Sequence, residues 1–223
     1  MYEFEPGYED PVALLARAAE FADIEDEGRW ELIRRLHMRT DAAAFAATAE
    51  AAGAANLRLR LVAVAVLGQL GYRANRPYLE QTLPILLSAI DHAEDPTLIE
   101  GAVYALAHLG DGRALTPVLR HVGHRDDDVR QAVAFALTSL TDPEQPATSA
   151  VQAMLELTRD TAEDVRDWAT FGLGEQWEVD SAEIRAALAA RLGDEEVIAA
   201  QAREGLAKRG VTDSPRSPGE SAR

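Results

Sequence analysis

Five segments of the chain share one spacing of apolar residues. In each segment, an apolar anchor is followed by another apolar residue four positions later and by leucine eight positions later. This spacing places the three side chains on one face of an α-helix, where they form a buried stripe. We therefore predict five helices, anchored at Leu59, Leu98, Val129, Val165 and Ile198.

A further helix is predicted before each anchored one, at residues 41–52, 76–90, 113–122, 150–157 and 181–192. Two more helices are predicted at residues 11–21 and 27–38. The anchors recur at intervals of 31 to 39 residues, and a period of about 20 to 50 residues is typical of a stacked array. No segment alternates apolar and polar residues as a strand would. The pattern therefore predicts an all-α fold of about six helical hairpins.

Three of the anchored helices follow a residue that caps helices well. Asn56, Asp95 and Asp126 stand three positions before their anchors, and their side-chain oxygens can accept hydrogen bonds from the free N–H groups of the first turn. The helix anchored by Val165 has alanine at this position. The neighbouring Thr161 is the candidate cap there.

Two of the segments resemble a known repeat. Residues 126–137 (DDDVRQAVAFAL) and 164–174 (DVRDWATFGLG) resemble HEAT repeats of the short bacterial kind that is also found in phycobilisome lyase subunits. The prolines Pro84 and Pro117, inside the first helix of a hairpin, are similar to the same repeats. The resemblance covers about residues 41–210 and implies a right-handed α-solenoid. It leaves the function open, because HEAT arrays mostly bind other proteins and only a few are enzymes.

The two ends of the chain differ from the repeats. Residues 1–10 form an acidic N-terminal segment, and residues 11–210 comprise the predicted solenoid. Residues 211–223 contain Ser, Pro, Gly and charged residues without an apolar run. We predict that this C-terminal tail is disordered.

The side of the anchored helices opposite the buried stripe is the candidate binding surface. In HEAT arrays these second helices line the concave face, so residues two and six positions after the anchor would form the floor of a groove. Aromatic residues in three consecutive repeats suit a peptide or helix lying along such a groove. The alternative is that the rings pack against the neighbouring hairpin. The candidate groove residues are Tyr104, Phe135, Phe171, Glu100, Gln131 and Asp167.

An arginine follows three of the anchors, at Arg60, Arg130 and Arg166. These residues could bind an anion. In HEAT-type repeats, however, such an arginine usually pairs with an aspartate at the cap of the next hairpin, and the resemblance implies a structural arginine ladder. Trp168, three positions after its anchor, is predicted to be a core residue.

Charge and composition exclude several functional classes. The chain has 22 Lys and Arg residues against 38 Asp and Glu residues, a formal net charge of −16, and this argues against nucleic acid and anionic membranes as partners. The absence of cysteine excludes thiol nucleophiles and Cys-ligated metals. His121 and His124 are close in sequence but are interpreted as polar residues at a helix end. We expect no metal and no cofactor.

The sequence offers no targeting or membrane signal. Its longest apolar stretch, residues 59–70, is too short to span a bilayer, so we expect a cytoplasmic protein. The predicted function is a non-catalytic scaffold that binds a neutral to basic protein or peptide segment in its groove. The alternative is a lyase- or chaperone-like subunit that acts on a protein-attached group, by resemblance to phycobilin lyases. A third class is a purely structural array whose convex face carries the apolar patch.

Overall fold

The computed structural model describes residues 9–211, and within this range the chain forms twelve α-helices and no strand. The all-α prediction is confirmed. The first helices of the hairpins are α1 (Pro11–Glu20), α3 (Ala42–Ala52), α5 (Leu79–His92), α7 (Leu115–Leu119), α9 (Thr148–Leu157) and α11 (Ala182–Ala190). The second helices are α2 (Glu27–His37), α4 (Leu57–Gln69), α6 (Pro96–Leu109), α8 (Asp127–Ser139), α10 (Glu163–Phe171) and α12 (Glu196–Lys208).

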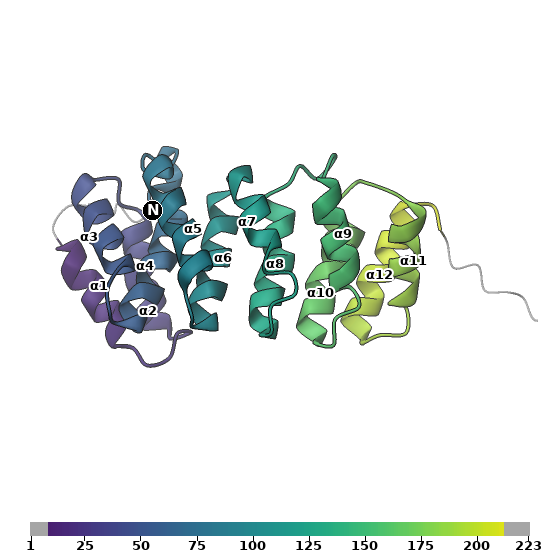
Figure 1. Ribbon diagram of the computed structural model, residues 1–223, viewed down its shortest axis with the longest axis horizontal. Helices are drawn as coiled ribbons and strands as arrows, with labels where there is room; N and C mark the ends of the chain where they lie inside the picture. Colours follow the sequence, from purple (N-terminus) through teal and green to yellow (C-terminus); the bar gives the residue numbers. More distant parts are fainter. Residues whose placement is uncertain (1–8, 212–223) are drawn as a thin grey trace, which may run out of the picture.

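The six hairpins stack side by side in chain order (Figure 1). Each second helix contacts the next one, from α2 to α4 and on to α12, and the first helices form a parallel layer in the same order. Neighbours in sequence are therefore neighbours in space throughout the described chain. This arrangement confirms the predicted α-solenoid.

The core lies between the two layers of helices. The anchors Leu98, Val129, Val165 and Ile198 are fully buried, because each points from its second helix towards the first layer. The prediction is wrong for Leu59, which is only partly buried. The reason is that α4 is contacted by helices on several sides, so its buried residues spread around the helix and do not follow a single stripe.

The predicted caps form at three helices. Asn56 accepts a hydrogen bond from the Arg58 amide, Asp95 from the Thr97 amide and Asp126 from the Val129 amide. At α10 the cap prediction is wrong, since Thr161 does not cap the helix. No side chain caps this helix, and the Asp160 carboxylate instead shapes the turn before it, because its Oδ1 accepts a hydrogen bond from the Ala162 amide at 2.9 Å.

The fifth hairpin departs from regular helix geometry after Phe171. There the chain continues as η3, a π-helix at Gly172–Gln176. A Cβ atom on Gly205 of α12 would lie 2.5 Å from the Cα atom of Gly174, so the two glycines allow η3 and α12 to pack backbone against backbone.

The side chain of Arg209, which follows α12, binds backbone carbonyl groups in and after η3. It donates hydrogen bonds to the carbonyl groups of Leu173, Trp177 and Val179 at 2.6, 3.1 and 2.9 Å. Carbonyl groups at the end of a helix lack partners within the helix, and Arg209 supplies them from the last hairpin.

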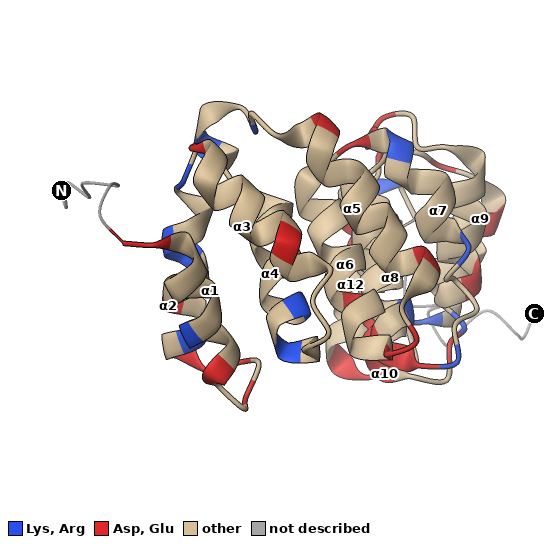
Figure 2. Cartoon of the chain, turned by 60° about the vertical axis from the view of Figure 1, so that its left-hand side comes forward, with Lys and Arg blue, Asp and Glu red and all other residues tan. Residues whose placement is uncertain are grey.

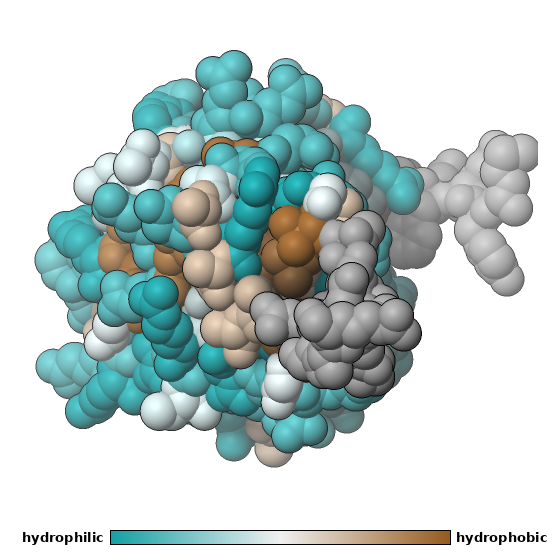
Figure 3. All heavy atoms as spheres, turned by 90° about the vertical axis from the view of Figure 1, so that its right-hand side faces the viewer, coloured by the Kyte–Doolittle hydropathy of each residue, from teal (hydrophilic) through white to brown (hydrophobic). Residues whose placement is uncertain are grey.

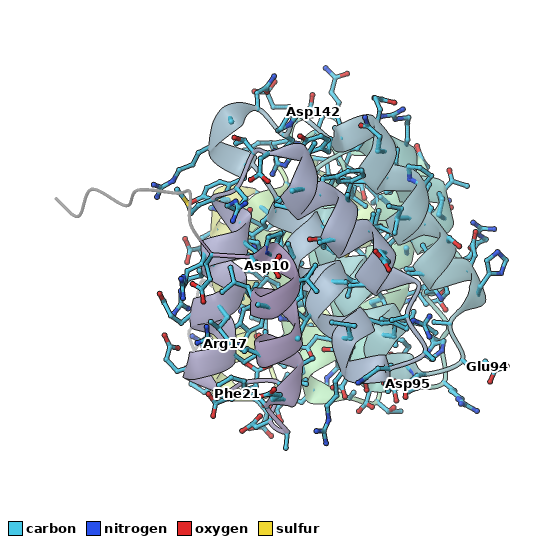
Figure 4. The ribbon with its side chains drawn as sticks, turned by 90° about the vertical axis from the view of Figure 1, so that its left-hand side faces the viewer. Asp10, Arg17, Phe21, Glu94, Asp95 and Asp142 are labelled. Carbon is cyan, nitrogen blue, oxygen red and sulfur yellow. The ribbon has the colours of Figure 1, made fainter. Side chains whose placement is uncertain are left out.

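Little of the two expected terminal segments lies within the described residues. Asp10 accepts a hydrogen bond from the Val12 amide at 3.2 Å and caps α1. Figure 4 shows Asp10 at one end of α1 and Phe21 at the other. Residues 1–8 and 212–223, which include most of the predicted tail, lie outside the described part of the chain.

Candidate partner-binding face

Four aromatic side chains form a continuous row across the second helices. The ring centroids are 5.3 Å apart between Tyr104 and Phe135, 5.1 Å between Phe135 and Trp168, and 5.8 Å between Trp168 and Phe171. We call these four residues the aromatic row. All four are partly buried: each ring packs against its neighbours in the row and keeps one part open to solvent. The rings therefore pack against neighbouring hairpins, as the alternative describes, and binding of a partner by the candidate groove residues stays a prediction.

Trp168 is a member of the row and not a core residue, so its predicted placement is wrong. It lies three positions after its anchor, next to the exposed side of α10. Its long indole ring reaches across to Phe135 of the preceding hairpin with an interplanar angle of 83°. Edge-to-face contacts of this kind add to the stability gained from burial.

A pocket of about 450 Å³ opens at the N-terminal end of the row, between α2, α4 and α6. Glu100 and Tyr104 of α6 form one wall, and Trp30 of α2 contributes another. We call this cavity the Glu100 pocket. Its other lining side chains include Glu25, Arg29, Leu61, Gln69, His108 and Gln131.

The structure thus brings together some of the candidate groove residues and separates others. Glu100, Tyr104 and Gln131 line the Glu100 pocket, and Phe135 contacts the Tyr104 ring beside it. Phe171 and Asp167 lie further along, on α10. The carboxylate of Asp167 accepts a hydrogen bond from Gln201 Nε2 at 2.9 Å, so this group is partly engaged within the fold.

Among residues 9–211, no side chain or backbone group forms a hydrogen bond or ion pair with the Glu100 carboxylate. Burial raises the pKa of Glu100 to about 7, and the nearby carboxylates of Asp128, Asp126 and Glu25 contribute to the shift. Burial and the charge of Glu100 likewise raise the pKa of Tyr104 to about 12. Burial is the main cause of both shifts, and the neighbouring carboxylates add to it.

Arg29 also lines the pocket but is held by other groups. Its Nη1 donates to the Ile24 carbonyl at 2.7 Å, and its guanidinium carbon lies 5.2 Å from the centre of the Trp30 ring. This cation–π contact and the carbonyl fix its position. Burial lowers the pKa of Arg29.

Two of the three predicted ladder arginines form bidentate ion pairs with the next hairpin. Arg130 binds Asp160 through Nε and Nη2 at 2.7 and 2.8 Å. Arg166 binds Asp194 in the same way, with both distances 2.9 Å. These contacts fix one hairpin relative to the next.

Arg60 departs from the predicted ladder, because it forms no ion pair with any residue of the described chain. The turn before α6 explains the difference. Ala93 stands two positions before the N-cap, where the turn before α10 has Asp160, and the Asp95 carboxylate caps α6 through the Thr97 amide. Glu94 and Asp95 lie together in this turn (Figure 4).

The N-terminal hairpin supplies site residues that the repeat pattern did not indicate. Trp30, Arg29 and Glu25 come from α2 and from the turn before it. The signal was the aromatic residue in the helix at 27–38. It could have been recognised by treating this helix as a second helix of the array, because α2 packs against α4 in the same layer.

Within 9–211, no group of three or more His, Asp or Glu side chains is placed to hold a metal ion. The rings of His121 and His124 lie 6.1 Å apart, centre to centre. In the same part of the chain, every helix is too short or too polar to cross a membrane.

Comparisons with solved structures identify the fold. The crystal structure of the Escherichia coli protein YibA is similar over 94% of this chain and 78% of its own, with a TM-score of 0.68 and 19% identity. A designed armadillo repeat protein in complex with the peptide (KR)4 gives a TM-score of 0.62 and 15% identity over 90% and 99% of the two chains. A HEAT-like repeat protein from the archaeon Thermococcus onnurineus gives a TM-score of 0.57 and 18% identity, over 91% of this chain and 81% of its own.

The sequence comparisons place the chain in a family. No curated protein sequence matches it significantly. The family model for HEAT repeats matches residues 46–138 and 83–174, which together span more than half of the chain. The chain therefore belongs to the HEAT repeat family.

Proposed function

We propose that this protein is a non-catalytic interaction module that binds a segment of another protein along the aromatic row. The observation that supports this proposal most directly is the row itself. Tyr104, Phe135, Trp168 and Phe171 span three consecutive hairpins and remain partly open to solvent. Aromatic side chains contribute much of the binding energy at protein interfaces, and a row of them suits an extended or helical segment.

The charge beside the row favours a neutral to basic partner. Glu100 and the first-turn residues Asp128 and Asp164 all act electrostatically on Tyr104, so this end of the row carries several carboxylates. Figure 2 shows acidic residues gathered along the lower edge of the molecule, around α10. The similar designed armadillo protein is in complex with (KR)4, and a repeat array of this class is therefore compatible with a basic ligand. Complementary charge speeds association and fixes orientation.

One observation favours the second candidate, a lyase- or chaperone-like subunit. That class requires a pocket beside Tyr104 or Trp168 with converging polar groups, and the Glu100 pocket lies beside Tyr104. It also calls for a deeply buried and unpaired Asp or His. Glu100 is only partly buried, and the deeply buried His37 is hydrogen-bonded to the Ala65 carbonyl at 3.0 Å. We therefore place binding before catalysis.

The third class, a structural array with an apolar convex face, has less support. The large apolar side chains exposed in the described residues are few and come from separate positions along the sequence, at Val12, Ile24, Tyr72, Val197 and Val211. The end face that includes α11 and α12 is mostly hydrophilic, with small hydrophobic areas between polar side chains (Figure 3).

Binding of a labelled (Lys-Arg)4 octapeptide, followed by fluorescence anisotropy, tests the proposal. Phe135→Ala and Phe171→Ala should each weaken binding about tenfold, the loss typical of an interface hot spot. Leu155→Ala is the matched control, because Leu155 is also a partly buried apolar residue but lies on α9 in the first layer. Unchanged affinity in both phenylalanine variants would remove the aromatic row from the proposal.

A further inference from the structure

We propose that the Glu100 pocket receives one arginine side chain of the partner, with its guanidinium group on the Glu100 carboxylate and its stem between Trp30 and Tyr104. This inference rests on the proposed function and specifies it further. It names the end of the aromatic row that anchors the partner and the chemistry of the residue that enters the pocket.

The pocket has room for an arginine side chain. Its volume of about 450 Å³ lies in the range of cavities that hold small ligands. Trp30 comes from the first hairpin and Tyr104 from the third, so the two aromatic side chains face the cavity from different helices. Guanidinium groups stack well on aromatic faces.

The hydrogen-bond acceptors of the pocket match the donors of arginine. The Glu100 carboxylate can take two parallel N–H bonds from a guanidinium group. Gln69 and Gln131 also line the cavity, and their amide oxygens can accept from the remaining N–H groups. A lysine ammonium has three donors on one nitrogen and cannot span these positions in one plane.

Acidic groups surround Glu100, and no cation of the described chain pairs with its carboxylate, although Arg29 also lines the pocket. The groups that act on this carboxylate are Asp128 and Asp126 at the start of α8 and Glu25 before α2, and all three are acidic. Arg29 is committed to the Ile24 carbonyl and to the Trp30 ring. A partly buried carboxylate without a counterion is costly, and an incoming guanidinium removes that cost.

A double-mutant cycle between protein and peptide tests the assignment. The probes are the (Lys-Arg)4 octapeptide and an analogue in which citrulline, an uncharged isostere, replaces every arginine. The proteins are wild type, Glu100→Gln and the control Glu204→Gln, which makes the same charge change on α12 at the far end of the array (Figure 1).

The expected result is a specific coupling between Glu100 and the guanidinium groups. In wild type and in Glu204→Gln, the arginine peptide should bind more tightly than the citrulline peptide by the same factor. In Glu100→Gln that factor should fall at least fivefold. The indole N–H signal of Trp30 should also shift in NMR spectra with the arginine peptide and much less with the citrulline peptide.

Two outcomes would overturn the assignment and are distinguishable from each other. If all three proteins give the same ratio while Phe135→Ala still weakens binding, the aromatic row binds the partner and the pocket does not hold arginine. If wild-type protein binds neither peptide, the proposed basic partner fails together with the pocket.

Discussion

Asp160 connects two hairpins, because its carboxylate accepts two hydrogen bonds from Arg130 of α8 and a third from the amide of Ala162 before α10. The side chains of Arg130 and Asp160 are 14% and 11% exposed. One aspartate therefore both shapes the turn before its own helix and holds the preceding hairpin. The Arg130 guanidinium holds the pKa of this carboxyl below its usual range.

Removing one partner of this pair should destabilise the fold strongly. We expect Arg130→Leu to lower the free energy of unfolding by about 2–4 kcal/mol, because a largely buried carboxylate loses its partner. The exposed pair of Arg120 with Asp91 provides the control, and Arg120→Leu should cost less than about 1 kcal/mol. Urea unfolding followed by circular dichroism measures both. Equal losses in the two variants would contradict the structural role of Arg130.

The second ladder pair makes stability depend on acid pH. The hydrogen bonds from Arg166 lower the pKa of Asp194 to about 2, from an ordinary value of 3.8. Stability from this group is thus fully present above about pH 4 and is lost as the pH falls towards 2. Asp194→Asn should show a smaller decrease in the free energy of unfolding between pH 5 and pH 2 than wild type. A parallel decrease in both proteins would argue against the pair.

Glu100 should have the opposite effect on stability. Its pKa of about 7 in the folded chain, against an ordinary 4.5, means that the unfolded chain gives up the proton at lower pH. The folded state therefore loses stability as the pH rises from about 4.5 to about 7. The free energy of unfolding of Glu100→Gln, measured relative to wild type, should be about 1–2 kcal/mol higher at pH 8 than at pH 4.5. Thermal unfolding at the two pH values tests this, and an unchanged difference would be evidence against the unpaired carboxylate.

The close approach of η3 and α12 predicts a strict requirement for glycine. An alanine at Gly205 would place its Cβ atom 2.5 Å from the Gly174 Cα atom and 3.0 Å from Leu188 Cδ1. We expect Gly205→Ala to cost about 1–3 kcal/mol, the range for overpacking. Gly123→Ala is the control, since no atom lies within 4 Å of its added Cβ. Chemical denaturation of both variants gives the comparison, and a neutral Gly205→Ala would show that the backbones can separate.

The sequence pattern was sufficient to predict the array of hairpins but not the side-chain contacts between neighbouring hairpins. Apolar spacing reports which side of a helix is buried, and this located the hairpins and most anchors correctly. It cannot report which side chains of one hairpin reach those of another. Trp168 was therefore assigned to the core, although its ring joins Phe135 of the preceding hairpin.

The Glu100 pocket shows the same limit over a longer distance. Trp30 and Glu100 are 70 positions apart in the sequence, and they share a cavity because α2 packs against α4 and α4 against α6 in one layer. The π-helix at Gly172–Gln176 was equally hidden. It lies where Gly174 and Gly205 of different hairpins meet and where Arg209 binds carbonyl groups, and no local pattern reveals these contacts.

The division of the Glu100 pocket between hairpins has a mechanical consequence. Trp30 belongs to the first hairpin and Tyr104 to the third, so any bending of the array between them changes the width of the opening. A guest held by both walls would act as a clamp and stiffen this half of the molecule. The curvature of the array and the occupancy of the Glu100 pocket would then be coupled. A force on the N-terminal hairpin would change the affinity of the pocket for its guest.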